Sequence, residues 1–247
     1  MYLITDIGNT ETKIFYFDAK LKIKNKIICK TDLLNSKNFE KKIKSFKKYH
    51  LKLNKVIISS VVPKSERILK NIFYKILKKK IYSFKKINLK KFVNIQVNKN
   101  QVGSDRIANA IGILNKRDNY IVIDFGTATT FDIIKKKDYL GGVIAPGIKL
   151  SLNNLVERAS LIPKIKLMRT KKVVGKNTLT AVRSGFFFGY SGLINKIIKV
   201  IKKETKTNYK IVLTGGLSYM FKNSLEEKCV VKKDLTINGI LKVAQSI

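Results

Sequence analysis

The sequence contains no tryptophan, one histidine, two cysteines and three prolines. The single histidine, His50, excludes a His-rich metal site and a mechanism that depends on histidine; lysines surround it, which is typical of a solvated surface residue. Cys29 and Cys229 lack metal-ligand spacing. So few cysteines indicate a reducing compartment, the cytoplasm, without structural disulfides.

Long apolar runs are also missing. The longest one, GFFFGYSGLI from Gly185, is too short and too broken by glycine and serine to span a bilayer. Asp6 stands where a signal peptide would need its apolar core. The sequence therefore predicts neither a membrane segment nor a secretion signal.

Acidic residues are scarce: 16 Asp and Glu stand against 52 Lys and Arg, a formal net charge of +36. Such a charge raises the possibility of nucleic-acid binding. Arginine is a small minority of the basic residues, however, and no helix-turn-helix, zinc or RNP-like signature is present. The abundance of Lys, Ile, Asn, Tyr and Phe indicates an A/T-rich coding bias, and a basic surface also attracts small anions.

With 45% hydrophobic residues in 247, the chain is long enough and apolar enough for one large or two modest globular domains. Strand-like apolar runs separated by turns predict three strands at 1–7, 12–18 and 21–29, and three more in YIVIDFG, ATTFDIIKKK and YLGGVIAPG. Further strands are expected at 55–62, 209–216 and 228–232, and helices at 36–53, 64–78, from 104, 148–159, 177–204 and from 235.

This order predicts an α/β fold that arose by internal duplication, with halves 1–117 and 118–247, each a mixed β-sheet flanked by helices. The matching residues Asp6 and Asp124 are 124 − 6 = 118 positions apart, about half the chain. Because no Pro/Gly/Ser-rich linker separates the halves, we expect them to pack around a nucleotide-binding cleft.

Two hairpin turns share one chemistry. YLITDIGNTETK and YIVIDFGTATT each run from an apolar strand into Asp, then Gly two residues later, then Thr. Glycine lets a ligand approach the backbone amides, and a carboxylate suits Mg²⁺ that also binds phosphate oxygens. One copy would be an ordinary hairpin turn. Two copies at matching places favour a nucleotide polyphosphate and phosphoryl transfer.

Other motifs have two possible meanings. Ser104 and Asp105 can cap a helix that begins there, or Asp105 can act as the base that takes a proton from a substrate alcohol. Thr178 can cap the helix that follows it. The segment LTGG at 213–216 is typical of any strand-to-helix turn, and GGVIAPG of a structural glycine loop.

Taken together, the motifs resemble type III pantothenate kinases, members of the actin, sugar kinase and heat-shock chaperone ATPase superfamily of duplicated ribonuclease H-like domains. The similar segments occur in the family's order over essentially the whole chain: DIGNT with Lys13, SSVVP, VGSDRIANA, VIDFGTATTFD, GGVIAPGI, VVGKNTLTAVRSG and LTGGL. The resemblance implies that the protein phosphorylates pantothenate with ATP, the first step of coenzyme A biosynthesis.

The resemblance also implies roles for single residues. Asp105 is the implied catalytic base, and Asp124 the implied ligand of a monovalent cation, K⁺ or NH₄⁺. Asp6 is implied to hold Mg²⁺, directly or through water. The implied ATP contacts are Asp6, Ile7, Gly8, Asn9, Thr10, Glu11, Thr12, Lys13 and Thr127. The implied pantothenate contacts are Gly103, Ser104, Asp105, Arg106 and Thr178, the last completed across a homodimer interface.

Two positions depart from the family pattern. Alanine is usual where this chain has Ser104, and a tyrosine that contacts pantothenate has no counterpart near Gln96 and Val97. Two other functions stay open at this level. One is a non-catalytic relative that acts as a nucleic-acid-binding accessory factor for transcription. The other is a kinase of the same superfamily for a different small-molecule alcohol.

Overall fold

The computed structural model describes the backbone of residues 1–247 and every side chain except that of His50. The surface position predicted for that side chain therefore lies outside the described residues. The chain forms two compact units, which we call the first unit (Met1–Ile113 with Leu235–Ile247) and the second unit (Leu114–Asp234). The predicted halves, 1–117 and 118–247, differ from these units mainly in the last helix and remain a prediction about domains.

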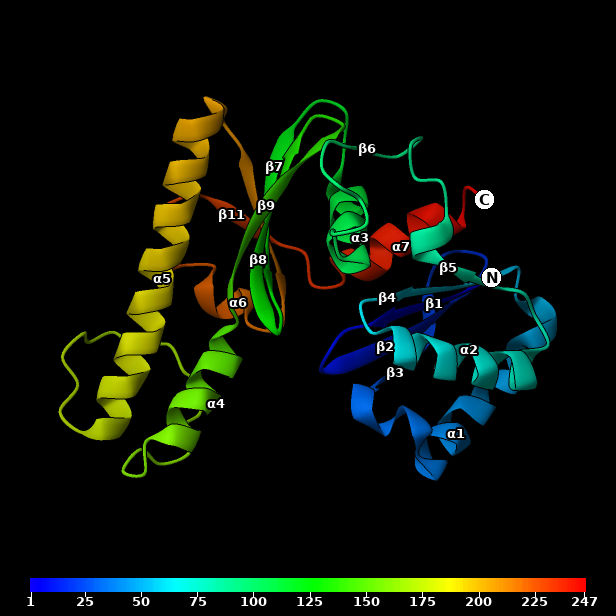
Figure 1. Ribbon diagram of the computed structural model, residues 1–247, viewed down its shortest axis with the longest axis horizontal. Coiled ribbons are helices and arrows are strands. Elements are labelled where there is room, and N and C mark those ends of the chain that lie inside the picture. Colours follow the sequence, from blue (N-terminus) through cyan, green and yellow to red (C-terminus); the bar gives the residue numbers. More distant parts are fainter. The chain divides into compact units, whose positions relative to one another are not determined.

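The sheet of the first unit has the strand order β3-β2-β1-β4-β5 (Figure 1). β1 (Tyr2–Ile7), β2 (Glu11–Phe17) and β3 (Ile23–Lys30) form an antiparallel meander. β4 (Lys55–Ser60) runs parallel to β1, and β5 (Ile81–Ser83) runs parallel to β4. The three opening strands predicted from the alternation are confirmed.

Helices cover both faces of this sheet. Leu3 and Ile7 of β1 share one core with residues of α1 (Lys37–Lys44) and α2 (Pro63–Leu77). Ile4, on the opposite face by strand alternation, is also fully buried. On that side α3 (Ser104–Ile113) and α7 (Leu235–Ala244) pack against β4 and, for α7, also β1. As predicted, Pro63 begins α2 at its first turn, where the missing N–H costs nothing.

The predicted helix at 36–53 is correct only in its first half. α1 ends at Lys44, and Ser45–Lys52 continues as the 3₁₀ helix η2. The Ser45 hydroxyl donates to the Lys42 carbonyl at 2.7 Å, a local side-chain bond that competes with regular helix hydrogen bonding. The unit also contains the 3₁₀ helices η1 (Thr31–Asn35) and η3 (Phe84–Lys86) and the short strand β6 (Asn94–Ile95).

The second unit repeats the arrangement, with strands in the order β11-β10-β7-β8-β9. β7 (Asn119–Phe125), β8 (Ala128–Lys135) and β9 (Asp138–Pro146) form the antiparallel meander. β10 (Lys210–Gly215) runs parallel to β7, and β11 (Cys229–Val231) parallel to β10. Read from the meander outward, the two units have the same strand order and directions, which confirms the predicted duplication.

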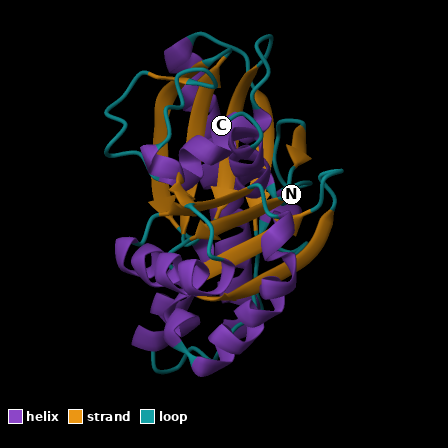
Figure 2. Cartoon of the chain, turned by 90° about the vertical axis from the view of Figure 1, so that its right-hand side faces the viewer, coloured by secondary structure: helices purple, strands orange, loops and turns teal.

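Helices α4 (Ile148–Arg158), α5 (Thr178–Thr205) and α6 (Ser218–Phe221) pack on this second sheet. Their buried side chains, among them Ile148, Ile194 and Phe221, share one core with Ile121 and Leu213 of the central strands. Figure 2 shows the mixture of sheet and helix throughout the chain. Among the described residues, no helix combines the length and the apolar character that crossing a bilayer requires.

Candidate active site

The first hairpin turn, Gly8–Thr10, joins β1 to β2. The Gly8 N–H donates to the Glu11 carbonyl at 3.0 Å and closes the turn. Asp6 and Lys13 are direct partners across the two strands, so their side chains lie on the same face of the sheet. Lys13 Nζ lies 3.7 Å from Glu11 Oε2, and both side chains are partly exposed, so solvent screens the pair. A carboxylate and an ammonium group therefore stand together at the base of the turn.

The turn from Gly103 to Arg106 lies at the same edge of the first sheet. Ser59 and Ser60, at the end of β4, stand opposite Asp6 and Ile7 of β1. The Ser104 hydroxyl donates to the Ser60 carbonyl at 2.9 Å and accepts from the Ser59 hydroxyl at 3.0 Å. Because parallel strands end at the same edge, these bonds place the start of α3 beside the first hairpin turn.

Asp105 follows directly, in the first turn of α3. Its Oδ1 accepts the Arg106 N–H, a free amide of the first helical turn, at 2.9 Å. Burial raises the pKa of the Asp105 carboxyl, and the Arg106 N–H and guanidinium oppose that rise. A side chain at Gly103 would place its Cβ 2.4 Å from Asp105 Oδ1, so the carboxylate lies directly over the glycine. Glycine is needed there for the carboxylate to occupy this position.

The second hairpin turn joins β7 to β8 and is one residue shorter than the first. Here the Gly126 N–H donates to the Ala128 carbonyl at 3.1 Å, and Thr127 is exposed at the tip. Gly147, just before α4, lies against this turn: a Cβ there would be 2.0 Å from the Thr127 carbonyl oxygen. The predicted glycine loop GGVIAPG therefore supports the second turn by close backbone packing.

Asp124 lies beside the end of β10, where Gly215 has a positive φ of 84°. A Cβ at Gly215 would lie 2.5 Å from Asp124 Oδ1 and 2.6 Å from the Phe125 carbonyl oxygen. Two oxygen atoms therefore lie close to the backbone at position 215, an approach that is possible because residue 215 is glycine. Oxygen ligands of this kind suit a hard cation.

Among the described side chains, no group of three or more His, Cys, Asp or Glu could hold a metal ion by itself. A divalent ion near Asp6 would therefore take most of its ligands from a nucleotide and from water. Mg²⁺ is commonly held in this way, by one or two carboxylates and substrate phosphates. The residues present thus fit a nucleotide-bound Mg²⁺ rather than a protein-enclosed one.

Thr178 is the first residue of α5 and is exposed. The alternative prediction, that Thr178 caps this helix, is wrong. Asn177 is the cap: its Oδ1 accepts the Thr180 N–H at 2.9 Å, and the Thr180 hydroxyl reaches back to the Asn177 N–H. Asn177 therefore takes the capping role, and Thr178 is exposed at the surface.

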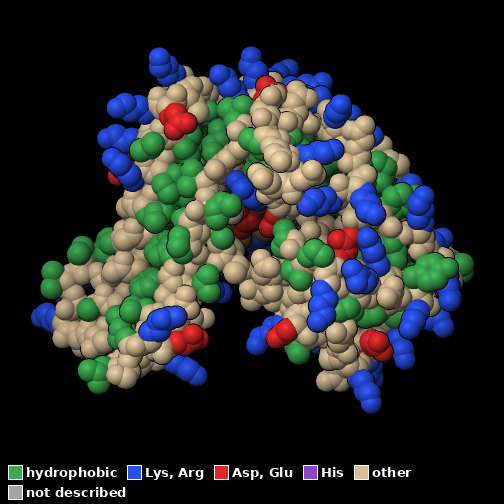
Figure 3. Space-filling view, viewed as in Figure 1, with side chains coloured by type: hydrophobic (Ala, Val, Ile, Leu, Met, Phe, Trp, Pro, Cys, Tyr) green, Lys and Arg blue, Asp and Glu red, His purple; other side chains and the backbone are tan. Residues whose placement is uncertain are grey.

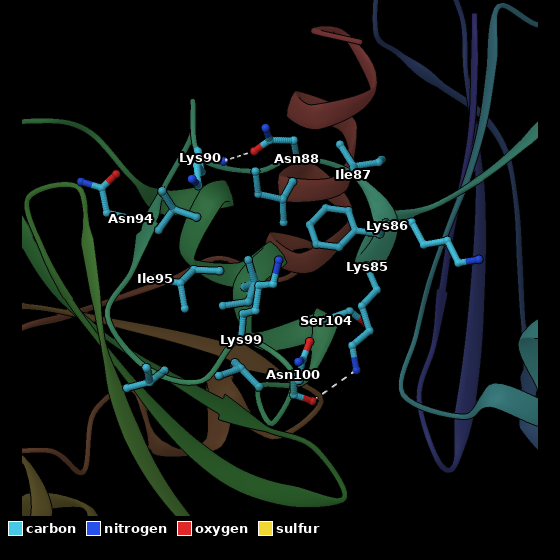
Figure 4. A pocket seen from close by; sticks show the side chains of 16 residues that line it. Lys85, Lys86, Ile87, Asn88, Lys90, Asn94, Ile95, Lys99, Asn100 and Ser104 are labelled. Atoms are coloured by element: carbon cyan, nitrogen blue, oxygen red, sulfur yellow. Dashed lines mark hydrogen bonds between the residues drawn. The ribbon is translucent and has the colours of Figure 1, made fainter.

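A cavity of about 790 Å³ lies within the first unit (Figure 4). Its lining comes from Ser104 and Ile107 of α3, and from η3 and the loop that follows it. Lys85 Nζ donates to the Asn100 carbonyl at 3.3 Å, which links two of the lining segments. The lining combines apolar and basic side chains: Phe84, Lys85, Lys86, Ile87, Asn88, Leu89, Lys90, Val93, Asn94, Ile95, Val97, Lys99, Asn100, Val102, Ser104 and Ile107.

Lysine and arginine side chains are spread over the visible face of both units rather than gathered in one stripe (Figure 3). This distribution agrees with a general lysine bias of the sequence. It does not single out a nucleic-acid-binding face on that side of either unit.

Solved structures define the class of fold. A protein from Campylobacter jejuni described as a Baf family transcriptional activator matches with a TM-score of 0.63 and 22% identity, over 99% of this chain and 98% of that one. A protein from Sinorhizobium meliloti described as a 2-dehydro-3-deoxygalactonokinase matches with a TM-score of 0.61 and 10% identity, over 100% and 99%. At such identities the matches show the fold alone, a duplicated arrangement of mixed sheets flanked by helices.

Sequence relatives define the family. A sequence model described as type III pantothenate kinase matches residues 2–200. The type III pantothenate kinase of Pelagibacter ubique is 49% identical over 247 residues, with all of both chains covered. The chain therefore belongs to the type III pantothenate kinase family.

Three residues at the site were not found by sequence reasoning: Ser59, Gly147 and Thr31, whose hydroxyl donates to the Gly8 carbonyl of the first turn at 2.7 Å. Ser59 lies within the motif SSVVP, whose chemical role the pattern does not reveal. Gly147 lies within GGVIAPG, where its close contact with Thr127 depends on tertiary packing. Thr31 lies in no motif, and its contacts span up to 23 residues of sequence.

Proposed function

We propose that the protein transfers the terminal phosphoryl group of ATP to the hydroxyl of pantothenate, giving 4′-phosphopantothenate at the start of coenzyme A biosynthesis. Its family membership supports this activity. Within the first unit, the observation that carries the proposal is the position of Asp105. A partly buried carboxylate with a raised pKa stands at the start of α3, at the sheet edge that carries the Gly8–Thr10 turn.

In this proposal Asp105 is the catalytic base. It accepts the proton of the substrate hydroxyl as the oxygen attacks phosphorus, while the bond from phosphorus to the ADP oxygen breaks. Arg106 is proposed to bind the pantothenate carboxylate, because its guanidinium can donate two parallel hydrogen bonds. Gly103 and Ser104 are proposed to complete the substrate-binding turn.

The first hairpin is proposed to bind ATP phosphates. Backbone N–H groups of the turn would donate to phosphate oxygens, and Lys13 would add a positive charge. Asp6 is proposed to hold Mg²⁺, directly or through water. The proposed contacts on this hairpin are Asp6, Ile7, Gly8, Asn9, Thr10, Glu11, Thr12 and Lys13.

The second unit is proposed to supply Thr127 as an ATP contact and Asp124 as a ligand of K⁺ or NH₄⁺. The Asp124 carboxylate and the Phe125 carbonyl, which lie close together beside Gly215, support this role because both are oxygen ligands suited to such a cation. A bound cation supplies positive charge that offsets phosphate charge.

The cavity beside Ser104 is proposed to receive the body of pantothenate. Its size is in the range of small-molecule pockets. The apolar lining suits the methyl groups of the substrate, and lysines such as Lys99, which extends across the cavity in Figure 4, suit an anion.

A homodimer is also proposed, with Thr178 as a further pantothenate contact that the assembly completes. In the second unit, exposed apolar side chains precede Thr178 in the segment after α4: Leu161, Met168, Val173 and Val174. Exposed apolar surface of this kind is typical of protein–protein contacts. We further propose a cytoplasmic location, since Cys29 and Cys229 are both free thiols.

The direct test is turnover. Purified protein with ATP, Mg²⁺ and K⁺ should convert pantothenate to 4′-phosphopantothenate, identified by mass spectrometry. The Asp105→Asn variant should lose about 10²- to 10⁴-fold in kcat, the usual contribution of a general base. A wild-type protein that phosphorylates another alcohol in preference to pantothenate would refute the substrate. Salt-sensitive DNA binding without any ATP turnover would refute the enzyme.

A further inference from the structure

Thr31, the first residue of η1, touches the first hairpin turn at two carbonyl groups. Its hydroxyl donates to the Gly8 carbonyl at 2.7 Å, and its N–H donates to the Thr10 carbonyl at 3.0 Å. The same hydroxyl lies 3.1 Å from the Thr12 hydroxyl. Since the Thr31 proton is directed to Gly8, the Thr12 hydroxyl is the donor in that pair. One side chain and one amide thus hold both ends of the turn.

The two threonine side chains are shielded from water, and the bond from Thr31 to Gly8 is partly buried. Thr12 is 0% exposed and Thr31 is 6% exposed, while Asn9 and Thr10 at the tip of the turn are exposed. Buried hydrogen bonds have few competing partners, so they define the geometry of the turn more strictly than solvent-exposed ones.

The bond to Gly8 fixes the direction of an amide. The described backbone contains no cis peptide bonds, so the carbonyl of Gly8 and the N–H of Asn9 point in opposite directions across one planar group. When Thr31 holds the Gly8 oxygen, the Asn9 N–H is directed away from Thr31. Outward-directed backbone N–H groups are the groups that bind phosphate in a turn.

We propose that Thr31 is a positioning residue for ATP: it orients the Gly8–Asn9 peptide so that the Asn9 N–H is presented to a phosphate oxygen. This inference rests on the proposed function, which assigns the turn to ATP phosphates. Thr31 itself touches the turn and not the nucleotide.

Three variants test the role. Thr31→Val has nearly the same shape but cannot hold the Gly8 carbonyl through its side chain, whereas Thr31→Ser keeps the hydroxyl. Thr5→Val is the matched control: Thr5 is a fully buried threonine of β1, and its Oγ1 has no hydrogen-bond partner among the described residues. Should Thr31→Val fail to fold by circular dichroism, Thr31→Cys provides a side chain of similar size with a weak donor.

The main measurements are the Kd of ATP by calorimetry without pantothenate, and KM for each substrate. Thr31→Val (or Thr31→Cys) should weaken ATP binding by about tenfold, the effect of one hydrogen bond, and raise KM for ATP but not for pantothenate. Thr31→Ser and Thr5→Val should stay within about twofold of the wild type. A purely structural role would not separate the two KM values in this way.

Several results would overturn the inference. Equal ATP affinity in Thr31→Val and the wild type would show that the hydroxyl does not orient the turn. An equal loss in Thr5→Val would show that any buried threonine of this sheet has the same effect. Absence of ATP binding by the wild type would overturn the proposed function together with this inference. The first two results leave the proposed function intact.

Discussion

The contact between α3 and α7 provides the sharpest prediction about stability. Gly239 of α7 lies so close to α3 that a Cβ there would be 1.8 Å from the Ala108 carbonyl oxygen and 2.6 Å from its carbon. These are backbone atoms, which cannot rotate away as the end of a side chain can. Gly239→Ala therefore forces the two helices apart.

The expected cost can be worked out from three effects. Overpacking a core lowers the unfolding free energy by about 1–3 kcal/mol. Because the obstacle here is backbone, we expect a loss at the upper end, about 3 kcal/mol. Moving α3 and α7 apart also weakens the 2.7 Å hydrogen bond from the Thr236 hydroxyl to Asn109 Oδ1. The loss of this bond lowers the unfolding free energy by about 1 kcal/mol more. Alanine regains about 1 kcal/mol of helix propensity over glycine. The net loss of unfolding free energy is about 3 kcal/mol.

Gly189→Ala is the matched control. Gly189 is also inside a helix, α5, but a Cβ there would have no heavy atom within 4 Å in the described structure. Only the propensity gain remains, so this variant should be about 1 kcal/mol more stable than the wild type.

Urea unfolding followed by circular dichroism measures both effects. At a slope of about 2 kcal/mol per molar urea, Gly239→Ala should lower the unfolding midpoint by about 1.5 M. The midpoint of Gly189→Ala should rise slightly. An unchanged midpoint for Gly239→Ala, or equal losses in both variants, would refute the reasoning from close backbone packing.

Two further predictions concern catalysis. Gly147→Ala should reduce kcat/KM by about 10²-fold, because its Cβ would displace the second turn by about 1 Å; Gly192→Ala, with open space around it, should not. Because burial raises the pKa of Asp105, the pKa that governs the acid limb of the kcat/KM profile should lie above the ordinary aspartate pKa of about 4. A folded-state pKa above the unfolded one means that stability falls as pH rises through that window. Asp105→Asn should therefore be at least as stable as the wild type at pH 7, and a less stable variant would contradict this account.

Much of the fold could be predicted from the sequence because each strand carries its own signal. The short apolar runs in YLITDI and NYIVIDF mark the two central strands, and Pro63 marks the start of α2. The final helix was predicted, but not its place in the first unit. That place depends on glycines at 112 and 239, which allow α3 and α7 to pack closely although the two glycines are more than a hundred residues apart in the sequence. No local pattern encodes such a pairing.

In the candidate site, too, some residues carry a local sequence signal and others depend on tertiary packing. Asp6 and Asp124 stand out in sequence because carboxylates near glycines at strand ends are recognisable, and Asp105 stands out because its segment GSDR resembles the family's substrate-binding turn. The residues that position them do not, since a threonine such as Thr31 or a serine such as Ser59 looks like any surface polar residue. Their roles come from burial and from partners 23 and 45 residues away.

The two hairpin turns are supported by different means, and this difference has a consequence. In the first unit, the Thr31 hydroxyl and amide hold the turn through hydrogen bonds. In the second unit, the backbone at Gly147 holds the turn by direct packing, with no side chain between. Hydrogen bonds can be restored by another hydroxyl, but the packed contact admits only glycine. Position 31 should therefore tolerate serine, whereas position 147 should tolerate no other residue without displacing Thr127.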